Sequence, residues 1–373
     1  MAQEFDYWMQ NRTISINVKG KTHKLARYNV EVDDPRPGMF YAPYSKQPLF
    51  HHMHHFTSFA ESYYEDYLDA QKLQGRQKQK EFYQNMKSGA ESGWDYSTRW
   101  FFKENGRVPS QDLLDIQTRH IIPVDLNSYL CKNAQILSKF YGLLGQESKA
   151  QEYERIFDKF TDSIDQVLWN EEKGAWFDYK ITNGKDDEKL NLQFYPSNLA
   201  PLWAKCYQQN RLLQKIIPVI NYVERLKAFD YPGGVPTSMV KSGQQWDFSN
   251  AWPPLQEILV TGLDNSGQPK AQELARELAD KWMKNVYASY VQSGKKMFEK
   301  YDVEQVGLPG GGGEYEVQEG FGWSNGVILE FLRKYPDLVS PDVDSRNNAA
   351  PGSATSLIAA CILLMIMAPM AHY

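Results

Sequence analysis

The feature that most restricts the fold of this 373-residue chain is a series of segments whose apolar side chains recur every three or four residues. Residues 126–141 show the pattern clearly, and residues 153–167 repeat it. This spacing places the apolar side chains on one face of a helix, which must be buried. Further helices are expected at residues 197–207, 211–226, 251–262, 271–291 and 326–334. Helices paired in this way, joined by Gly- and Pro-rich loops, predict an all-α fold of the α/α toroid type.

Three other segments complete the expected secondary structure. Residues 11–28 alternate apolar and polar side chains around Lys19-Gly20-Lys21, which is typical of a β-hairpin. A second hairpin is expected over residues 176–194, turning near residues 183–184. Residues 61–87 predict one long polar helix that ends near Gly89. The expected architecture is therefore helical with small β-hairpins, and no linker divides it.

Composition excludes several classes of protein. Aromatic residues make up 14% of the chain, with 23 Tyr and 10 Trp, which argues against disorder and fits a concave surface lined by rings. The net charge is −5 and like charges form no long run, so no nucleic-acid partner is expected. Cys131, Cys206 and Cys361 are too few and too scattered for a disulfide framework or a zinc site, so free thiols are expected.

Four histidines cluster at residues 51–55 and raise the question of a metal site. No acidic residue or cysteine lies beside them with the spacing of metal ligands. The cluster is therefore interpreted as a polar loop tract, and no metal site is predicted.

The two ends of the chain differ in character. The N-terminal residues lack the basic and apolar regions of a signal peptide. Residues 357–371 are almost continuously apolar, but shorter than the ~20 residues that span a bilayer. With small residues at 347–350 and a polar spacer, they resemble a glycolipid-anchor signal. A weak membrane anchor and a core-buried end are the alternatives. The predicted organisation is a domain at 1–340, a spacer at 341–356 and a hydrophobic tail at 357–373.

Three short blocks combine aromatic, glycine and acidic residues: residues 92–96, 242–247 and 298–326. Aromatic rings bury the apolar faces of a sugar, and carboxylates bind its hydroxyls and transfer protons. The blocks therefore predict a site that cleaves sugars.

An inverting glycosidase needs a protonated acid and an ionised base on opposite sides of the glycosidic bond. Asp95 lies between Trp94 and Tyr96, where burial would raise its pKa and keep it protonated. Glu299, with Lys300 beside it, suits the ionised base. The alternative for either residue is a helix-capping or ion-paired carboxylate, but the clustered context favours catalysis.

Two further features of the blocks admit two interpretations each. Residues 310–313 are all glycine, which either lets the backbone approach a ligand closely or forms a flexible surface loop. Glu314 follows them directly. Trp246 and Trp252 either stack on sugar or fill the core.

Longer matches now point to one family. Residues 231–263, YPGGVPTSMVKSGQQWDFSNAWPPLQEILVTGL, resemble a diagnostic motif of the trehalases, glycoside hydrolases that split α,α-trehalose into two glucoses. Residues 90–100 resemble the family's general-acid segment, and residues 298–302 its general-base segment. Residues 310–315 and 318–326 follow at the family's spacing. The resemblance runs from residue 4 to about residue 334.

The resemblance implies an (α/α)6 toroid, inversion at the anomeric centre and no cofactor. Asp95 is then the acid and Glu299 the base, and trehalose is the small-molecule partner. The implied substrate-binding residues are Gly93 and Glu314, together with Arg36, Pro37 and Glu61 of a Pro-Arg-Pro-Glu-Ser segment; Trp246 is the aromatic candidate.

The sequence departs from the family's pattern in two places. Gly38 follows Pro37 where the family has Glu, and the matching Glu61 comes later, so residues 38–60 resemble an insertion. The family's first motif is absent, so the expected toroid is incomplete on its N-terminal side. A catalytically silent truncated form that binds only sugar or a partner is the alternative to an active trehalase. A different glycosidase on a similar toroid is a third hypothesis. For a full-length form, the expected location is the extracellular face of the plasma membrane or the secreted fraction.

Overall fold

The computed structural model describes residues 1–36, 57–103, 106–182, 189–313 and 316–338, without the side chains of residues 57–61. Within these ranges the chain is mainly helical. The helices are α1 (Ala2–Asn11), α2 (Thr57–Gln71), α3 (Arg76–Ser92), α4 (Val124–Leu143), α5 (Glu147–Ser163), α6 (Ala200–Ala204), α7 (Leu212–Leu226), α8 (Pro253–Asp264), α9 (Pro269–Gln292) and α10 (Gly322–Lys334). The expected all-α class is confirmed.

The described strands are short and pair only as two-stranded antiparallel sheets. The pairs are β1 (Thr13–Val18) with β2 (Lys21–Ala26), β3 (Phe102–Lys103) with β4 (Val108–Pro109), β5 (Ile121–Ile122) with β8 (Tyr179–Lys180), β6 (Trp169–Asn170) with β7 (Ala175–Trp176), and β9 (Asn250–Ala251) with β10 (Tyr301–Asp302). These pairs tie loops together rather than form a layer.

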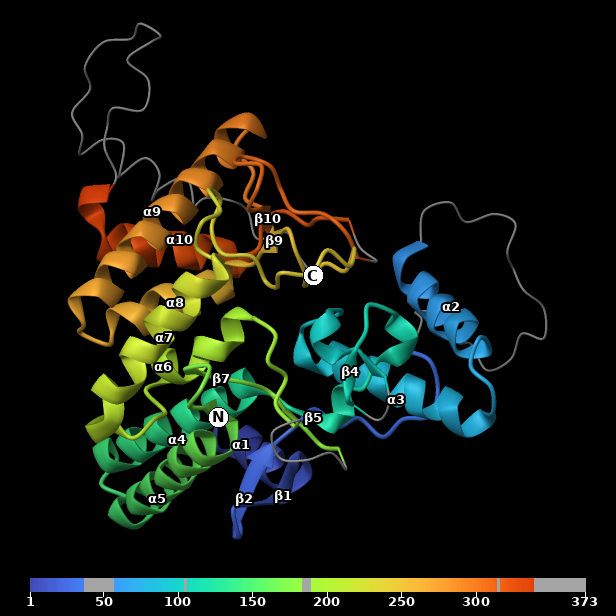
Figure 1. Ribbon diagram of the computed structural model, residues 1–373, viewed down its shortest axis with the longest axis horizontal. Helices are drawn as coiled ribbons and strands as arrows, with labels where there is room; N and C mark the ends of the chain where they lie inside the picture. The colour runs from blue at the N-terminus through green and yellow to red at the C-terminus, as the bar shows by residue number, and fades with distance from the viewer. Residues whose placement is uncertain (37–56, 104–105, 183–188, 314–315, 339–373) are drawn as a thin grey trace, which may run out of the picture.

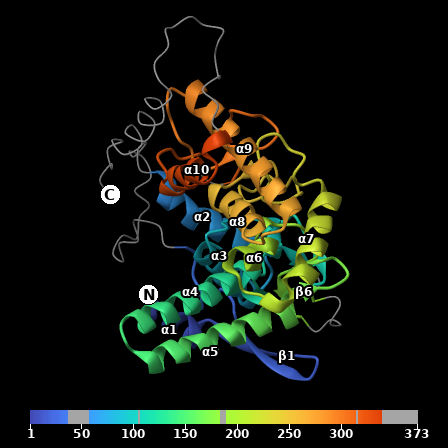
Figure 2. The same cartoon turned by 90° about the vertical axis from the view of Figure 1, so that its left-hand side faces the viewer.

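The helices follow an arc through the molecule (Figure 1). The arc runs from α4 and α5 through α6, α7 and α8 to α9 and α10, while α2 and α3 lie at the opposite side. Helix α4 packs on α5, and α8 packs on α9, as the second view also shows (Figure 2). One continuous cluster of buried apolar side chains runs from Phe5 to Tyr335, so the described residues share a single core.

The strongest helical patterns of the sequence are confirmed. In α4 the expected face is buried, since Leu126, Leu130 and Leu137 are each at most 4% exposed. Helix α5 follows with Tyr153 and Phe160 buried, and its chain continues into a π-helical turn. Helices α8 and α9 both begin at proline, which suits a helix start because the first-turn N–H groups have no partner within the helix.

The single helix expected over residues 61–87 is wrong. The structure has two helices there, because α2 ends at Gln71 and α3 begins at Arg76. Gly75 lies between them with φ of 92°, a conformation that side-chain-bearing residues rarely adopt. The backbone conformation of Gly75 therefore interrupts the expected helix, although the polar sequence on both sides suits a helix.

The first expected hairpin is confirmed. Strands β1 and β2 pair from Thr13 opposite Ala26 to Val18 opposite Lys21, and they turn at Lys19 and Gly20, both with positive φ. Of the second, the described residues show an antiparallel bridge between Tyr179 and Leu190, while strand β8 itself pairs with β5. The expected tip of this second hairpin at residues 183–184 lies outside the described residues.

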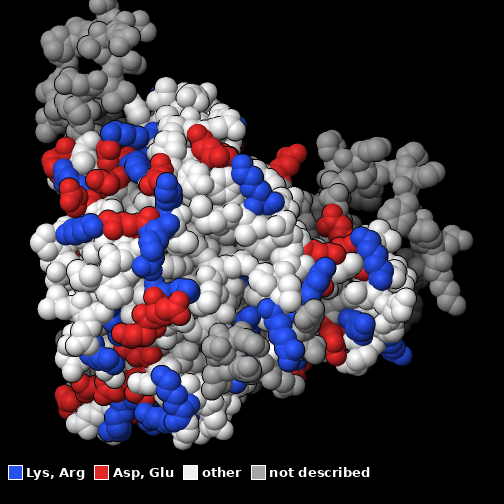
Figure 3. Space-filling model, in the orientation of Figure 1, with Lys and Arg blue, Asp and Glu red and all other residues white. Residues whose placement is uncertain are grey.

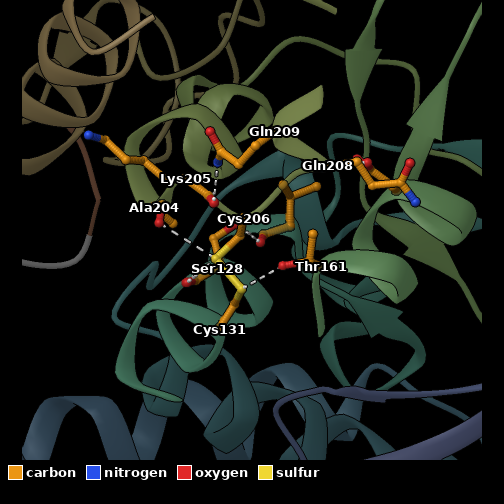
Figure 4. Close-up of a disulfide and its surroundings, with 10 residues drawn as sticks. Ser128, Cys131, Thr161, Ala204, Lys205, Cys206, Gln208 and Gln209 are labelled. Carbon is orange, nitrogen blue, oxygen red and sulfur yellow. Dashed lines mark hydrogen bonds between the residues drawn. A yellow bond between two sulfur atoms is a disulfide. The ribbon is translucent and has the colours of Figure 1, made fainter. Parts of the chain in front are cut away.

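The free thiols expected at Cys131 and Cys206 are a further error, because the two residues form a disulfide (Figure 4). Cys131 lies on α4, and Cys206 follows α6. Although 75 residues separate them in sequence, their Cα atoms are 6.3 Å apart, since α4 packs on α6. Only the tertiary packing reveals this pair. Cys361 lies outside the described residues.

Positive and negative side chains intermingle on the face shown in Figure 3, and its centre is largely uncharged. Among the described residues, no helix combines the length and the apolar character needed to cross a membrane. The expected spacer and tail at residues 341–373 lie outside the described part of the chain, as does nearly all of the expected insertion at 38–60.

Candidate active site

Asp95 lies just beyond the C-terminal end of α3. Gly93 ends the helix in the left-handed conformation, with φ of 74°, and its N–H donates to the Ala90 carbonyl. This is the usual way for glycine to turn a chain out of a helix. The next residue, Trp94, is buried, whereas Gly93 is exposed and Asp95 is half-buried. The turn thus places a carboxyl group at the edge of an aromatic core.

A buried arginine supports this segment from beneath. Arg99 is fully buried and forms paired hydrogen bonds with the carboxylates of Asp125 and Asp178, at 2.7–2.9 Å. Its guanidinium also lies 4.4 Å from the centre of the Trp94 ring. Burial opposes the charge, but the two carboxylates outweigh it and raise the Arg99 pKa well above its ordinary value. Arg99 therefore stays charged and fixes Trp94.

A buried aspartate joins the first block to the second. The Asp247 carboxylate accepts hydrogen bonds from the Ser97 hydroxyl and the Thr98 N–H, both at 2.9 Å, and from the Ser242 hydroxyl. Burial raises the Asp247 pKa, while these hydrogen bonds act in the opposite direction. The contact holds together segments that are about 150 residues apart in sequence.

A stack of indole rings fills the space between the blocks. Trp246 stacks on Trp252 at 3.8 Å and on Trp94 at 5.0 Å between ring centres. Trp323 meets Trp252 edge to face. Trp246 is only 5% exposed and packs in the core, and its contact with sugar stays a prediction. Its buried indole N–H has no hydrogen-bond partner among the described residues.

Glu299 lies on an irregular segment before β10. The carboxylate is close to the fully buried Lys300 ammonium, with an Oε1–Nζ distance of 2.8 Å. The backbone is fixed on both sides: the Glu299 N–H donates to the Gln318 carbonyl, and the Trp323 indole donates to the Glu299 carbonyl. Glu299 is 7% exposed, so its carboxylate is held within the same aromatic surroundings.

Gln245 connects the two carboxylate segments. Its side-chain Nε2 donates to the Asp95 carbonyl at 2.5 Å, and its Oε1 accepts from the Lys300 ammonium at 3.0 Å. Lys300 in turn donates to Glu299. Two side chains thus link the backbone of the predicted acid to the carboxylate of the predicted base. The sequence placed Gln245 in the second block but gave no sign of this role.

The glycine run packs against the protein's own chain. The Gly313 N–H donates to the Gly243 carbonyl at 3.0 Å, and a Cβ on Gly312 would lie 2.6 Å from that carbonyl oxygen. The side-chain amide of Asn250 holds the Gly311 backbone on both sides: its nitrogen donates to the Gly311 carbonyl, and its oxygen accepts from the Gly311 N–H. Gly312 and Gly313 therefore pack closely against residues 243–245, where a side chain would not fit, although residues 311–313 are exposed on their other side. Glu314 lies outside the described residues.

Arg36 reaches the acid segment from a distant part of the chain. It is 8% exposed, its guanidinium pairs with Asp66 on α2, and it lies 5.2 Å from the centre of the Tyr96 ring. Of the other predicted substrate contacts, Pro37 lies outside the described residues, and the side chain of Glu61, on α2, is not described.

No metal site is found in the described part of the chain. Nowhere in it do three or more His, Cys, Asp or Glu side chains group so that they could hold a metal ion. The histidines of residues 51–55 lie outside that part.

Inverting glycoside hydrolases act with two carboxyl groups, and this site holds two carboxyl-bearing segments set among indole rings on a helical scaffold. The sequence profile of the family described as Trehalase matches residues 47–336. The chain is 41% identical over 342 residues to the trehalase of Apis mellifera, covering 92% of this chain and 50% of that protein. It is also 41% identical over 337 residues to the Homo sapiens trehalase, covering 90% and 52%.

This chain therefore belongs to the trehalase family. It spans about half the length of the curated relatives it matches. The solved structure of a neutral trehalase from Saccharomyces cerevisiae superposes with a TM-score of 0.52 at 20% identity, over 70% of this chain and 44% of that one. At this identity the likeness concerns the fold, and it supports the expected toroid class.

Proposed function

We propose that this chain hydrolyses α,α-trehalose to two glucose molecules, with Asp95 as general acid and Glu299 as general base. The observation that carries the proposal is the connection from Asp95 through Gln245 and Lys300 to Glu299. It brings the two predicted catalytic segments into one hydrogen-bonded unit. Membership of a family whose relatives are named trehalases supports the choice of substrate.

In the proposed reaction, the Asp95 carboxyl donates its proton to the glycosidic oxygen, and the bond to the anomeric carbon breaks. Glu299 removes a proton from a water molecule that attacks the same carbon from the opposite face. The Lys300 ammonium is the counter-ion of the carboxylate, which is the form that a general base needs. Attack from the opposite face yields β-glucose from one ring, whereas the departing ring is released as α-glucose.

The test is to incubate the purified 373-residue chain with trehalose and record the anomeric proton signals by NMR before mutarotation. Equal amounts of α- and β-glucose are expected. Two α-glucoses would contradict inversion, and no glucose would overturn the proposal for this chain. If calorimetry then showed trehalose binding without hydrolysis, the silent sugar-binding form would be supported. Faster cleavage of maltose than of trehalose would favour a different glycosidase.

The remaining predicted substrate contacts belong to the same proposal: Arg36, Pro37, Glu61, Gly93, Trp246 and Glu314. Of these, Gly93 is exposed beside Asp95, and a Cβ there would meet no atom within 4 Å. That opening leaves room for a ligand at the end of α3. Replacing Gly93 by Val tests this role, and the expected result is a higher KM for trehalose.

For a full-length form, we propose attachment to the outer face of the plasma membrane through a glycolipid added near residues 347–350. The small residues, polar spacer and apolar tail of the sequence support it. Release of the expressed protein from intact cells by a phosphatidylinositol-specific phospholipase C is the expected result. Retention on the cells after that treatment would contradict the proposal.

A further inference from the structure

We infer that Gln245 and Lys300 are positioning residues, which together set the alignment of the acid segment with the base carboxylate. The inference rests on the proposed function, because it assigns its roles relative to Asp95 and Glu299. Its starting point is the continuous series of contacts from the Asp95 carbonyl to Gln245, then to Lys300, and finally to Glu299.

The chemistry of these groups allows only one orientation of the Gln245 amide. A lysine ammonium only donates hydrogen bonds, and a backbone carbonyl only accepts them. The amide oxygen must therefore face Lys300, and the amide nitrogen must face Asp95. If the side chain turned over, its amide nitrogen would face the Lys300 ammonium, donor against donor. Its amide oxygen would face the Asp95 carbonyl, acceptor against acceptor, and both contacts would be lost. The bridge is specific for a carboxamide.

Burial makes the bridge rigid. Lys300 is fully buried and Gln245 is 4% exposed, so bulk water does not replace lost partners. A buried ammonium is costly unless it is paired, and Lys300 satisfies this need with Glu299, Gln245 and the Trp252 ring at 5.0 Å. The ammonium therefore remains between the two segments.

The backbone of Gln245 is equally constrained. Its carbonyl accepts hydrogen bonds from the Asn250 amide at 2.9 Å and from the Trp252 indole at 3.0 Å. Gly313 packs so closely that a Cβ there would lie 2.8 Å from the Gln245 Cβ. The amide thus projects from a fixed point toward Asp95. Because small misplacements of catalytic groups are costly in rate, this fixed point affects turnover.

Lys300 also acts on the charge of Glu299. On the neighbouring segments, Lys296 pairs with Glu319 at 2.9 Å, and Asp302 binds the Ser249 hydroxyl. The predicted acid, Asp95, lies across the Gln245 bridge. Lys300 therefore places a positive charge in direct contact with the Glu299 carboxylate.

The first experiment replaces Lys300 by Met, which keeps the length of the side chain and removes its charge. We expect kcat on trehalose to fall about 10²-fold, as when one preorganised donor is removed. The loss should appear in kcat rather than in KM, because Lys300 contacts the base carboxylate. Lys296→Met is the matched control, because Lys296 is half-exposed and belongs to the same segment. It should leave both quantities unchanged.

The second experiment replaces Gln245 by Met, which breaks the bridge but leaves the Lys300–Glu299 pair. We expect kcat to fall at least 10-fold, because the acid segment loses its alignment while the Lys300–Glu299 pair remains. A smaller loss than in Lys300→Met separates the effect of alignment from that of the charge. A merely structural role for either residue would lower the thermal midpoint without lowering kcat of the folded enzyme. Wild-type kcat in either variant would overturn the inference.

Thermal unfolding tests the bridge independently of activity. Because both single variants disrupt the same contact, the double variant should lower the melting temperature by less than the sum of the single shifts. If the wild-type chain released no glucose, the proposed function would fail, while this non-additivity would still support the bridge. Strictly additive shifts would contradict the bridge, whatever the activity.

Discussion

The segments that carry the predicted acid and the predicted base are held in place by different means. The segment around Asp95 is supported by buried charges, namely Arg99 between two aspartates and Asp247 beneath two hydroxyl groups. The segment around Glu299 is supported by one buried cation, by backbone hydrogen bonds and by closely packed glycines. Buried charges dominate the support of the first segment, whereas the second adds backbone hydrogen bonds and steric fit to a single buried cation. The two therefore differ in the kind of substitution that disturbs them.

The largest expected effect is the loss of activity when the predicted acid or the predicted base is replaced. We expect Asp95→Asn and Glu299→Gln each to lower kcat/KM on trehalose by about 10²–10⁴-fold, because each removes a proton-transfer group. Both variants keep the size of the side chain. Glucose release under steady-state conditions measures the loss.

Glu319→Gln is the control for this test, because Glu319 is more than half exposed and its backbone bridges Phe298, directly before Glu299. It should retain near-normal activity. If either Asp95→Asn or Glu299→Gln also did so, the role assigned to that residue would be wrong.

The next effect concerns the charged support of the acid segment. Arg99→Met should lower the free energy of unfolding by about 3–5 kcal/mol, since it leaves the buried carboxylates of Asp125 and Asp178 without their partner. Urea unfolding followed by circular dichroism measures the change. Lys215→Met removes another buried cation, which pairs with Asp165 at 3.0 Å, so it serves as a comparison. Both should destabilise the chain.

Of Arg99 and Lys215, Arg99 is the residue that contacts Trp94. The milder Arg99→Lys should therefore also reduce kcat, whereas Lys215→Arg should not. Equal activity in the two conservative variants would show that charge beneath Trp94 is not what fixes the acid segment.

The steric support of the base segment is tested by two neighbouring glycines. Gly312→Ala should cost about 1–3 kcal/mol, because Gly312 has φ of 79° and an added Cβ would lie 2.6 Å from the Gly243 carbonyl oxygen. Gly311→Ala is the matched control, since no atom lies within 4 Å of its Cβ position and its φ is not in the left-handed region. Thermal unfolding compares them. Equal melting temperatures would contradict the close packing of the run.

The smallest expected effect is a pH dependence of stability that arises from Asp247, which supports the segment of the predicted acid. Burial raises the Asp247 pKa, so the folded chain takes up this proton more readily than the unfolded chain does. The resulting contribution of Asp247 to stability is complete below its pKa in the unfolded chain, which is about 3.9. It is lost as the pH rises through the pKa in the folded chain. The stability difference between wild type and Asp247→Asn should therefore shrink between pH 4 and pH 7. A difference that grew with pH would reverse the assigned sign.

Local patterns in the sequence were sufficient for much of the fold. The spacing of Leu126, Leu130 and Leu137 predicted α4, and the alternation around Gly20 predicted the first hairpin. These features depend on neighbours within four residues, or on one tight turn. The helix expected over residues 61–87 was wrong because a single backbone conformation at Gly75 outweighed a uniformly polar pattern.

The site was predicted less completely. Asp95 and Glu299 could be named because each lies in an aromatic block with a family pattern. Whether they act as acid and base stays a prediction. The roles of Gln245 and Asp247 depend on partners about 150 residues away, and no local pattern encodes such a distance. The Cys131–Cys206 disulfide was missed for the same reason.

The sequence alone therefore determined most of the helices, the first hairpin, the family and the residues that carry the proposed chemistry. These follow from short-range periodicity and from local motifs. The tertiary structure decided how those residues are held: by the buried charges under Asp95, by the glycines packed near Glu299, and by the amide of Gln245 between them. Burial supplies the physical reason. A buried polar group must find a partner, and only the folded chain determines which distant residue provides it.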